Sequence, residues 1–421
     1  MSDNRLRIIV MGYIVRGPLG GMVWSNLQYL MGLARLGHDV YFVEDSDDYA
    51  SCYDPIRDVN DTDPSYGLAF AARELGRIGL DGRWAYWDSH TSRWLGPAAG
   101  QILEVCASAD LLLNLCGINP IRPWLAGIPV RVLVDEDPAF AQISYLTDAA
   151  ARQRALQHTV FFTFGANVGK SGCSIPDDGL PWRATRQPVV LDALPVTVGR
   201  ADGKFTTVMQ WESYPAREYA GVRYGMKSDS FAPYPDLPAR TRQVFELALH
   251  GAQAPRQDLR ARRWLIRDSR QTTVDVPTYL RYIRESKAEF SVAKHGYVVS
   301  RSGWFSERSV TYLTSGRPVL IEETGFSDWL PTGAGVVPFS SPEEALASVD
   351  AINSHYEFHC RTARAIAEEY FGSSKVLPRF VEAAMNARDG LGRRAVMTGA
   401  ESGAGPATVA VPVDARHTES G

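Results

Sequence analysis

Apolar runs and amphipathic stretches alternate from the start of the chain. Residues 8–15 form a continuous apolar run, which is typical of a strand buried on both faces. After a glycine-containing segment, residues 23–36 place apolar side chains at helical spacing, and Gly37 ends the pattern. Residues 40–43 resume the strand pattern. A strand, a helix and a second strand in this order predict a βαβ unit and therefore a parallel sheet.

The same alternation recurs along the chain, with a proline-containing join at residues 191–195. Two successive α/β units predict two domains, residues 1–192 and 193–372, followed by a helix at residues 373–389. From Gly390 to Gly421 large apolar residues are few, so we expect a disordered tail. Further strands are expected at residues 110–116, 130–134, 160–164, 205–211, 264–266, 289–293 and 318–321, and further helices at 68–78, 240–250, 279–287, 342–353 and 358–371.

The composition argues against several classes of protein. Hydrophobic residues make up 45% of the 421, and the formal net charge of −4 gives no electrostatic footprint for nucleic acid or anionic membranes. The first apolar run is too short to span a bilayer, and the N-terminus lacks a cleavable signal pattern. The five cysteines are widely spaced and odd in number, which argues against a disulfide framework or a structural zinc site. We expect a cytoplasmic protein without a nucleic-acid partner, transmembrane segment or bound metal.

Two glycines, Gly20 and Gly21, lie between the first strand and the first helix. Glycine lets the backbone turn sharply and approach a ligand closely, and the start of the following helix favours anionic groups. The spacing does not fit the G-x-G-x-x-G pattern of dinucleotide sites. Two interpretations therefore stand equally: a loop at the edge of a ligand cleft, or a tight turn without a ligand.

Residues 300–336 contain the strongest candidate for a phosphate site. Ser306 is a good N-cap for a helix at residues 307–315, with Glu307 and Arg308 in the first turn, where Arg308 can hold a phosphate oxygen. After the next strand, Thr324 and Gly325 offer a hydroxyl and backbone N–H groups to a polar ligand. The alternatives are a well-capped surface helix with an exposed Glu–Arg pair, and a plain connecting loop.

These motifs, in this order, resemble the GT-B glycosyltransferases, most closely the glycosyl-transferases-group-1 type and its spore-maturation-like relatives. The resemblance covers roughly residues 7–45, 128–137 and 205–388, including the SGRPVL and TGFSDWLPTGAG segments. It implies an α/β protein of two facing Rossmann-like domains with a cleft between them. It also implies that the helix before SGRPVL binds the nucleotide diphosphate and that a final helix crosses back to the first domain.

The resemblance carries over unevenly to individual residues. The positions at which the family has two glutamates are Gly303 and Thr311 here, and Glu307 lies between them, so the donor contacts and the stereochemistry stay open. Lys227 resembles the lysine that pairs with the donor diphosphate, although a lone lysine is as often a solvated surface charge. Asp135 falls where the family has a histidine facing the cleft, and a carboxylate there is a candidate general base; a charged loop at a strand end is the alternative.

The sequence thus predicts metal-independent transfer of a sugar from a nucleotide-diphosphate donor to a small-molecule acceptor, in bacterial natural-product or cell-surface glycan biosynthesis. The nucleotide sugar is a co-substrate, and no cofactor is expected. Residues 135–137 spell an Asp-x-Asp pair, but the rest of the chain does not fit the single-domain fold that uses such a pair to hold a metal. Two alternatives remain: a nucleotide-sugar epimerase on the same fold, and a non-catalytic nucleotide-sugar-binding protein.

Overall fold

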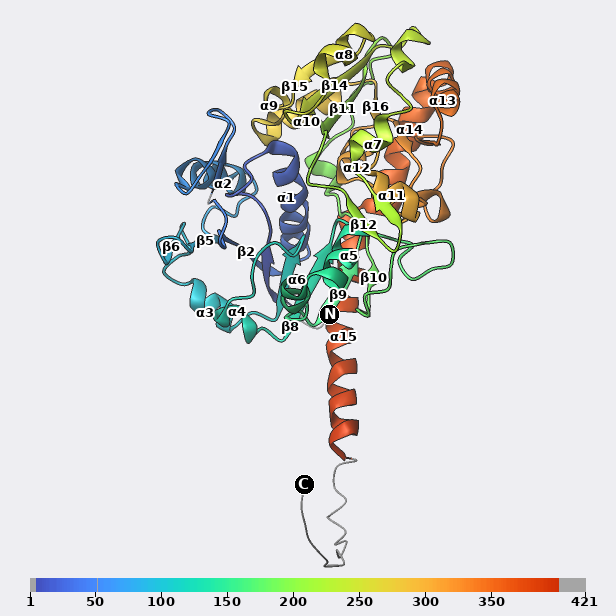
Figure 1. Cartoon of the computed structure of the whole chain (residues 1–421). Helices are drawn as coiled ribbons and strands as arrows, with labels where there is room; N and C mark the ends of the chain where they lie inside the picture. Colours follow the sequence, from blue (N-terminus) through green and yellow to red (C-terminus); the bar gives the residue numbers. More distant parts are fainter. Residues whose placement is uncertain (1–4, 51, 401–421) are drawn as a thin grey trace, which may run out of the picture.

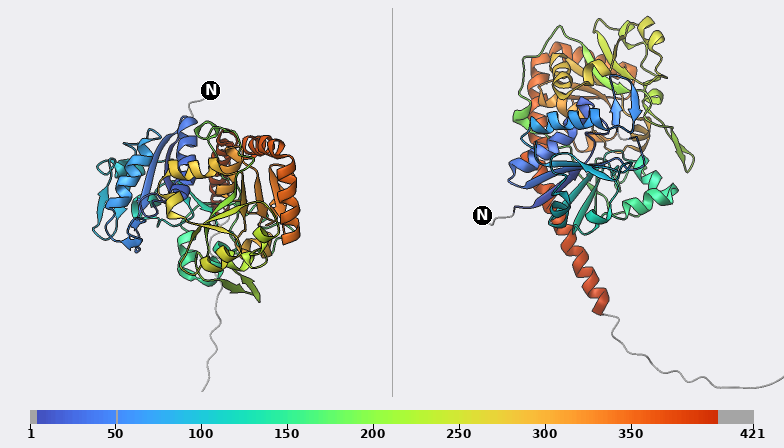
Figure 2. Two further views of the ribbon diagram at one scale, coloured as in Figure 1. Left: turned by 90° about the horizontal axis from the view of Figure 1, so that it is seen from above. Right: turned by 90° about the vertical axis from the view of Figure 1, so that its left-hand side faces the viewer.

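The computed structural model describes residues 5–50 and 52–400 of the chain. Its strands form two large sheets flanked by helices, and Figure 1 shows the two halves stacked one above the other. The first sheet has the order β10-β9-β8-β7-β1-β2-β5-β6, and the second has the order β15-β14-β11-β16-β17-β18. The right-hand view of Figure 2 again shows the two halves stacked one above the other.

The bounds of the strands are as follows. The first sheet contains β1 (Arg7–Met11), β2 (Asp39–Asp45), β5 (Trp84–Asp88), β6 (Arg93–Leu95), β7 (Leu111–Leu115), β8 (Val130–Asp135), β9 (Val160–Thr163) and β10 (Arg183–Ala184). The second contains β11 (Phe205–Gln210), β14 (Phe245–His250), β15 (Leu265–Asp268), β16 (Ala288–Ser291), β17 (Val319–Glu322) and β18 (Val336–Phe339). Two hairpins pair β3 (Cys52–Asp54) with β4 (Val59–Asp61) and β12 (Arg217–Tyr219) with β13 (Val222–Tyr224).

The helices connect the parallel strands. In the first half they are α1 (Gly20–Arg35), α2 (Ser65–Gly76), α3 (Ile102–Ala107), α4 (Pro123–Ala126), α5 (Phe140–Thr147) and α6 (Ala149–Ala155). In the second half they are α7 (Lys227–Phe231), α8 (Arg256–Ala261), α9 (Arg270–Thr273), α10 (Val276–Glu285), α11 (His295–Ser300), α12 (Glu307–Thr314), α13 (Pro342–Ser354), α14 (Tyr356–Ile366) and α15 (Ser373–Ala400). Short 3-10 turns lie at Leu191–Ala193, Leu237–Ala239 and Phe326–Asp328, and a π-helical turn at Ala367–Phe371 follows α14.

The sheets are parallel because their strands are apolar on both faces. Strand β7 is buried along its whole length, and β1 is buried at every position after Arg7. Every strand pair of the second sheet is parallel, and in the first sheet only β6 runs antiparallel to its neighbour β5. The prediction of two Rossmann-like α/β domains is confirmed by these sheets.

The last helix, α15, returns to the first half of the molecule. It packs against α1, β8 and β9. The ring of Phe380 lies 4.5 Å from that of Phe162 on β9 and 6.4 Å from that of Tyr29 on α1. The first part of α15 thus crosses back to the first sheet, whereas Figure 1 shows its later turns extending away from both halves.

Two expectations for individual segments are wrong. Residues 240–250 were expected to be helical, but Phe245–His250 forms β14, because pairing with β11 over six residues outweighs the helix propensity of Glu246, Leu247 and Ala248. The disordered tail was expected from Gly390, but α15 continues to Ala400. The rest of the expected tail, residues 401–421, lies outside the described residues.

No helix in the described part of the chain combines the length and the apolar character needed to cross a membrane.

Candidate active site

The loop that follows β1 is held by a buried carboxylate at the end of β2. Glu44 accepts hydrogen bonds from the backbone N–H groups of Ile14, Val15 and Arg16 at 2.7–2.8 Å. Burial raises the pKa of Glu44 to about 7, although these three donors favour its charged form. The shape of the loop that borders the cleft thus depends on one side chain from the neighbouring strand.

Gly20 and Gly21 form the first turn of α1 and lie against the second domain. A β-carbon on Gly20 would lie 2.2 Å from the carbonyl oxygen of Asp275, and one on Gly21 would lie 3.0 Å from the ring of Tyr279. The glycines therefore allow α1 to pack closely against α10. Gly21 also lines a narrow pocket between the domains together with Glu307. Contact with a ligand at these glycines stays a prediction.

The first turn of α12 has the cap that the sequence predicts. The hydroxyl of Ser306 accepts a hydrogen bond from the N–H of Arg308 at 3.2 Å. Glu307 is half-buried, and its carboxylate has no hydrogen bond or ion pair within the described chain. The cap is confirmed, and the hydroxyl of Ser306 is engaged by the helix itself.

Arg308 points into the second domain and is paired there. Its Nε lies 2.6 Å from Oε1 of Glu289, its Nη2 donates to Ser291 at 2.6 Å, and its Nη1 donates to the carbonyl of Val208 at 2.9 Å. Glu289 is fully buried, so this guanidinium neutralises a carboxylate that has no access to water. The sequence predicts that Arg308 can hold a phosphate oxygen, but in the structure its guanidinium is already paired within the second domain.

A small cavity lies where β16 and β17 end and α12 begins. Its lining includes Ser291, Ser309, Glu322 and Thr324. The hydroxyl of Ser309 is buried and has no hydrogen-bond partner in the described part of the chain. Ligands of open parallel sheets bind at the carboxyl ends of the strands, and the first-turn N–H groups of a helix have no intrahelical partners. This cavity is the position in the second domain best suited to a phosphate-containing ligand.

Lys227, the first residue of α7, lies near this region without a partner. Its ammonium group makes no hydrogen bond or ion pair with any described residue, and the side chain is half-buried. Burial and the neighbouring charge of Arg308 lower the pKa of Lys227 to about 7. A half-buried amine with no protein partner is well placed to receive an anion from outside the protein.

Thr324 is bonded within the second domain, and Gly325 also contacts the first domain. The hydroxyl of Thr324 donates to the carbonyl of Trp304 at 2.6 Å, and the N–H of Gly325 donates to Glu323 at 2.5 Å. Gly325 has a φ of 92°, and its carbonyl accepts a 2.9 Å hydrogen bond from Asn167 of the first domain. The groups expected to bind a ligand are thus engaged by the protein, although Thr324 also lines the cavity.

On the first domain, the side chain of Asp135 is buried, whereas that of its neighbour Glu136 is only half-buried. Asp135 is 3% exposed and accepts hydrogen bonds from Thr163 at 2.7 Å, Gln142 at 3.0 Å and the N–H of Asp137 at 2.8 Å. Glu136 is half-buried and receives a 2.9 Å hydrogen bond from the thiol of Cys116. Burial, followed by the repulsion of Glu307, raises the pKa of Glu136 to about 7. The two glutamates therefore interact across the domain boundary.

Asp137, the next residue, joins the two domains. It forms a 2.8 Å ion pair with Lys294, and the hydroxyls of Tyr214 and Tyr297 also donate to its carboxylate. All three partners belong to the second domain. Together with the indole of Trp304, which donates to the carbonyl of Glu136 at 3.2 Å, these bonds hold the end of β8 against the second sheet.

Sequence reasoning missed the residues that complete the cleft, namely Cys116, Glu136, Asp137, Ser309, Tyr214, Lys294 and Tyr297. A signal existed for part of this set, because residues 135–137 are three acidic residues that directly follow a buried strand. Their different surroundings depend on the direction of each side chain, which alternates along an extended chain.

Backbone strain marks the same edge of the first sheet. Cys116, after β7, has a φ of 58°, and Ala139, after β8, has a φ of 73°. Left-handed conformations at residues other than glycine are costly and are often found at binding sites. Within the described residues no group of three or more histidine, cysteine, aspartate or glutamate side chains is arranged to hold a metal ion.

Comparison of the sequence with family models finds no match, and comparison with curated proteins finds none. Solved structures do match. The α-glucosyltransferase AGT in complex with UDP has a TM-score of 0.56 at 10% identity, covering 90% of this chain and 99% of that one. Anabaena HepE, in complex with UDP and glucose, has a TM-score of 0.54 at 12% identity, covering 90% and 99%.

A third structure, AviGT4, a glycosyltransferase involved in avilamycin A biosynthesis, has a TM-score of 0.51 at 13% identity and covers 91% of this chain and 98% of that one. At these identities the likeness establishes the fold. The similarity extends over both sheets and over nearly the full length of each matched chain. The protein therefore has the two-domain GT-B fold that its sequence motifs resemble.

Proposed function

We propose that the protein is a glycosyltransferase that moves a sugar from a nucleotide-diphosphate donor to a hydroxyl group of a small-molecule acceptor. We include in the proposal that no metal ion takes part, and that the reaction belongs to bacterial natural-product or cell-surface glycan biosynthesis. The observation that carries it is Lys227, which has no partner among the described residues and interacts electrostatically with Glu307 and Arg308 in the first turn of α12. AGT and HepE in their UDP complexes make UDP-glucose the first donor to test.

In this proposal the second domain holds the donor. The diphosphate lies between the ammonium group of Lys227 and the first turn of α12, where the hydroxyl of Ser309 and free N–H groups add hydrogen bonds. As the bond between sugar and phosphate breaks, negative charge grows on the leaving diphosphate, and these donors stabilise that charge. Arg308 keeps the wall of the cavity in place through Glu289 and Ser291.

The first domain supplies the acceptor side. The sequence alone favours Asp135 as the general base, but its carboxylate already accepts three hydrogen bonds, so we assign this role to Glu136. A carboxylate whose pKa is about 7 accepts a proton from a hydroxyl group more readily than an ordinary one. If configuration is retained through a front-face reaction, the leaving phosphate itself accepts the proton and the contribution of Glu136 is small.

The test is a panel of nucleotide sugars incubated with the whole protein, with and without a mixture of hydroxylated acceptors. Nucleotide release that depends on an acceptor supports transfer. Isomerisation of the sugar without an acceptor would make the protein an epimerase, and tight binding without turnover would make it a binding protein. One similar structure, an α-glucosyltransferase, is a complex with UDP-glucose and DNA, so DNA belongs among the acceptors tested, and the absence of a nucleic-acid partner stays a prediction.

Within this assay, Glu136→Gln and Asp135→Asn separate the two candidate bases. We expect Glu136→Gln to lower turnover about a hundredfold if configuration is inverted, with donor binding nearly unchanged. Asp135→Asn keeps a hydrogen-bonding side chain and is expected to have the smaller effect. A larger loss in Asp135→Asn, in a folded protein, would return the role to Asp135, and NMR of the product decides between inversion and retention.

A further inference from the structure

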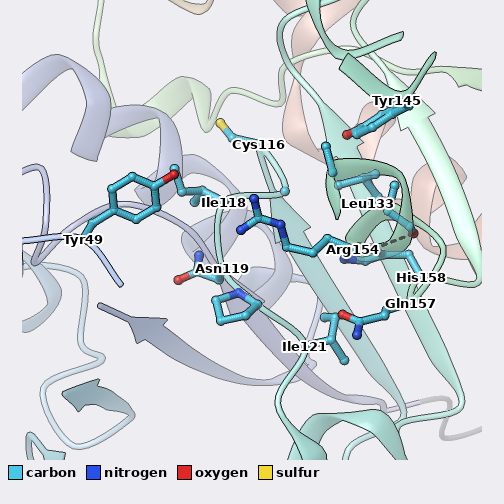
Figure 3. A pocket seen from close by; sticks show the side chains of 14 residues that line it. Tyr49, Cys116, Ile118, Asn119, Ile121, Leu133, Tyr145, Arg154, Gln157 and His158 are labelled. Carbon is cyan, nitrogen blue, oxygen red and sulfur yellow. Dashed lines mark hydrogen bonds between the residues drawn. The ribbon is translucent and has the colours of Figure 1, made fainter. Parts of the chain in front are cut away.

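A second cavity, of about 210 Å³, opens in the first domain beside the ends of β7 and β8. We call it the first-domain cavity. One wall is the loop after β7, from Cys116 to Ile121, and the opposite wall is formed by Leu133 of β8, Tyr145 of α5 and the end of α6. Figure 3 shows the side chain of Arg154 extending between these walls toward Tyr49.

Arg154 carries the only formal positive or negative charge among the residues that line this cavity. The remaining lining is apolar or neutral. His158, which is also in the lining, stays neutral, because burial lowers its pKa to about 4 and both of its ring nitrogens have hydrogen-bond partners.

Most of the hydrogen-bonding groups of the Arg154 guanidinium have no partner among the described residues. Its side chain is 53% exposed, and its one ion contact is with Asp47 at 3.4 Å, through Nη1. Asp47 also lies 3.8 Å from Arg122, so it keeps a cationic neighbour when Arg154 turns to another anion. Nε and Nη2 of Arg154 have no partner in the described part of the chain.

Neutral polar groups surround the guanidinium. The hydroxyls of Tyr49 and Tyr145 and the amide of Gln157 make no hydrogen bond with other described residues. The ring of Tyr49 is held in place, because the guanidinium of Arg16 lies 5.0 Å from its centroid. Hydroxyl and amide groups on partly apolar walls suit a hydroxylated ligand, and the free guanidinium suits an anionic group at one end of it.

The cavity is connected to the proposed reacting centre through one residue. Cys116 lines the cavity, and its thiol donates to Glu136 at 2.9 Å. The chain reaches this position through two successive left-handed residues, Cys116 at φ 58° and Gly117 at φ 62°. The side chain of Cys116 therefore lies between the cavity and the carboxylate of Glu136.

We propose that the first-domain cavity binds the acceptor, and that the acceptor is a hydroxylated compound with a carboxylate or phosphate group that pairs with Arg154. This inference rests on the proposed glycosyl transfer. In the complex the anionic group lies against the free edge of the Arg154 guanidinium, and the hydroxyl to be glycosylated lies toward Glu136. No covalent step beyond the proposed transfer is involved.

The test compares three probes that share one ring: glucose, glucuronate and glucose 6-phosphate. We expect each anionic probe to bind about tenfold more tightly than glucose, the scale of one charged hydrogen bond. Arg154→Gln should remove this preference. The matched control is Arg152→Gln on the same helix, because Arg152 donates to the carbonyl of Asp178 and does not line the cavity. Whichever of glucuronate and glucose 6-phosphate binds more tightly shows whether the anionic group of the acceptor is a carboxylate or a phosphate.

Two further measurements locate the binding and separate it from the proposed function. Hydrogen–deuterium exchange of the loop from Cys116 to Ile121, which lines the cavity, should slow when glucuronate or glucose 6-phosphate binds, as followed by mass spectrometry. Calorimetry with UDP-glucose tests the donor site in the same protein. Equal binding of the three probes, no binding below about 10 mM, or unchanged exchange in this loop would overturn the inference while leaving donor binding intact. Selective anion binding without UDP-glucose binding would also overturn it, because the cavity would then not be an acceptor site.

Discussion

The start of α12 and the start of α7 each present a basic side chain near the cleft, but only one of the two is neutralised by the protein. Arg308 on α12 is in contact with the buried Glu289, with Ser291 and with a backbone carbonyl. Lys227 on α7 has no such partner among the described residues, and burial with the nearby Arg308 lowers its pKa to about 7. A charged residue in the first turn of a helix is therefore not by that position alone a ligand-binding residue; what decides is whether the protein has already supplied the opposite charge.

The largest expected effect is on stability at α12. We expect Arg308→Ala to lower the free energy of unfolding by about 3–5 kcal/mol, because it leaves Glu289 buried without a counter-ion. Urea unfolding measures this loss. Arg301→Ala is the control, since that arginine is about half exposed and its ion pair with Asp328 is 3.3 Å long, so its loss should cost at most about 1 kcal/mol.

This prediction also tests the interpretation that the sequence alone suggests. If Arg308→Ala unfolds like the wild type but no longer binds UDP-glucose, Arg308 is a phosphate ligand, and the contrast between the two helices disappears.

The second effect is on donor binding at α7. We expect Lys227→Met to weaken UDP-glucose binding by about 1–3 kcal/mol, the scale of a lost charged hydrogen bond, while stability stays the same or rises. Stability is not lost because a lysine with a lowered pKa costs the folded protein energy to keep charged. Calorimetry measures the affinity, and Lys375→Met, an exposed lysine on α15 that pairs with Glu369, is the control. Unchanged affinity in Lys227→Met would remove the observation on which the proposed function rests.

The third effect is on the pH dependence of donor binding. In the free protein Lys227 loses its proton near pH 7, whereas beside a diphosphate it keeps it. Binding above about pH 7 must therefore take up a proton, and the affinity should fall by at most about tenfold for each further pH unit. Calorimetry in buffers of different ionisation enthalpy should show proton uptake approaching one at about pH 8. If the affinity for UDP-glucose stays the same from about pH 6 to 9, the ammonium group of Lys227 does not contact the diphosphate.

The smallest effect concerns Glu307, whose negative charge favours protonation of Lys227 and disfavours ionisation of Glu136. Glu307→Gln should lower the pKa of both groups and move the midpoint of the affinity curve to lower pH, with a change in binding free energy below about 1 kcal/mol. Glu357→Gln, an exposed glutamate on α14, should leave the curve in place. A midpoint that moves upward would mean that Glu307 does not act on Lys227 through its charge.

Sequence reasoning located the elements of the site more accurately than the direction of its side chains. The N-cap at Ser306 follows from a local signal and is confirmed. The return of the final helix was implied by the family resemblance, and α15 packs against β9 as that resemblance implies. No local signal predicts that Gly20 and Gly21 pack α1 on α10. Residues 20 and 275 are distant in sequence and meet only when the two domains associate. The strand β14 was missed for a related reason, because its pairing partner lies in another segment.

By itself the sequence determined the two parallel sheets, since apolar runs of strand length separated by helical patterns bury their side chains in few other ways. It also determined which loops would meet at the cleft, because the ends of parallel strands lie on one edge of a sheet. Only the tertiary structure decided which charged groups on those loops are free. Glu289 comes from a strand and Arg308 from a helix, and their pairing leaves Lys227 without a partner among the described residues. Thr163 and Gln142 enclose Asp135, whereas Glu136 stays only half-buried. These outcomes depend on distances of a few ångströms between segments remote in sequence, and no local pattern of residues encodes them.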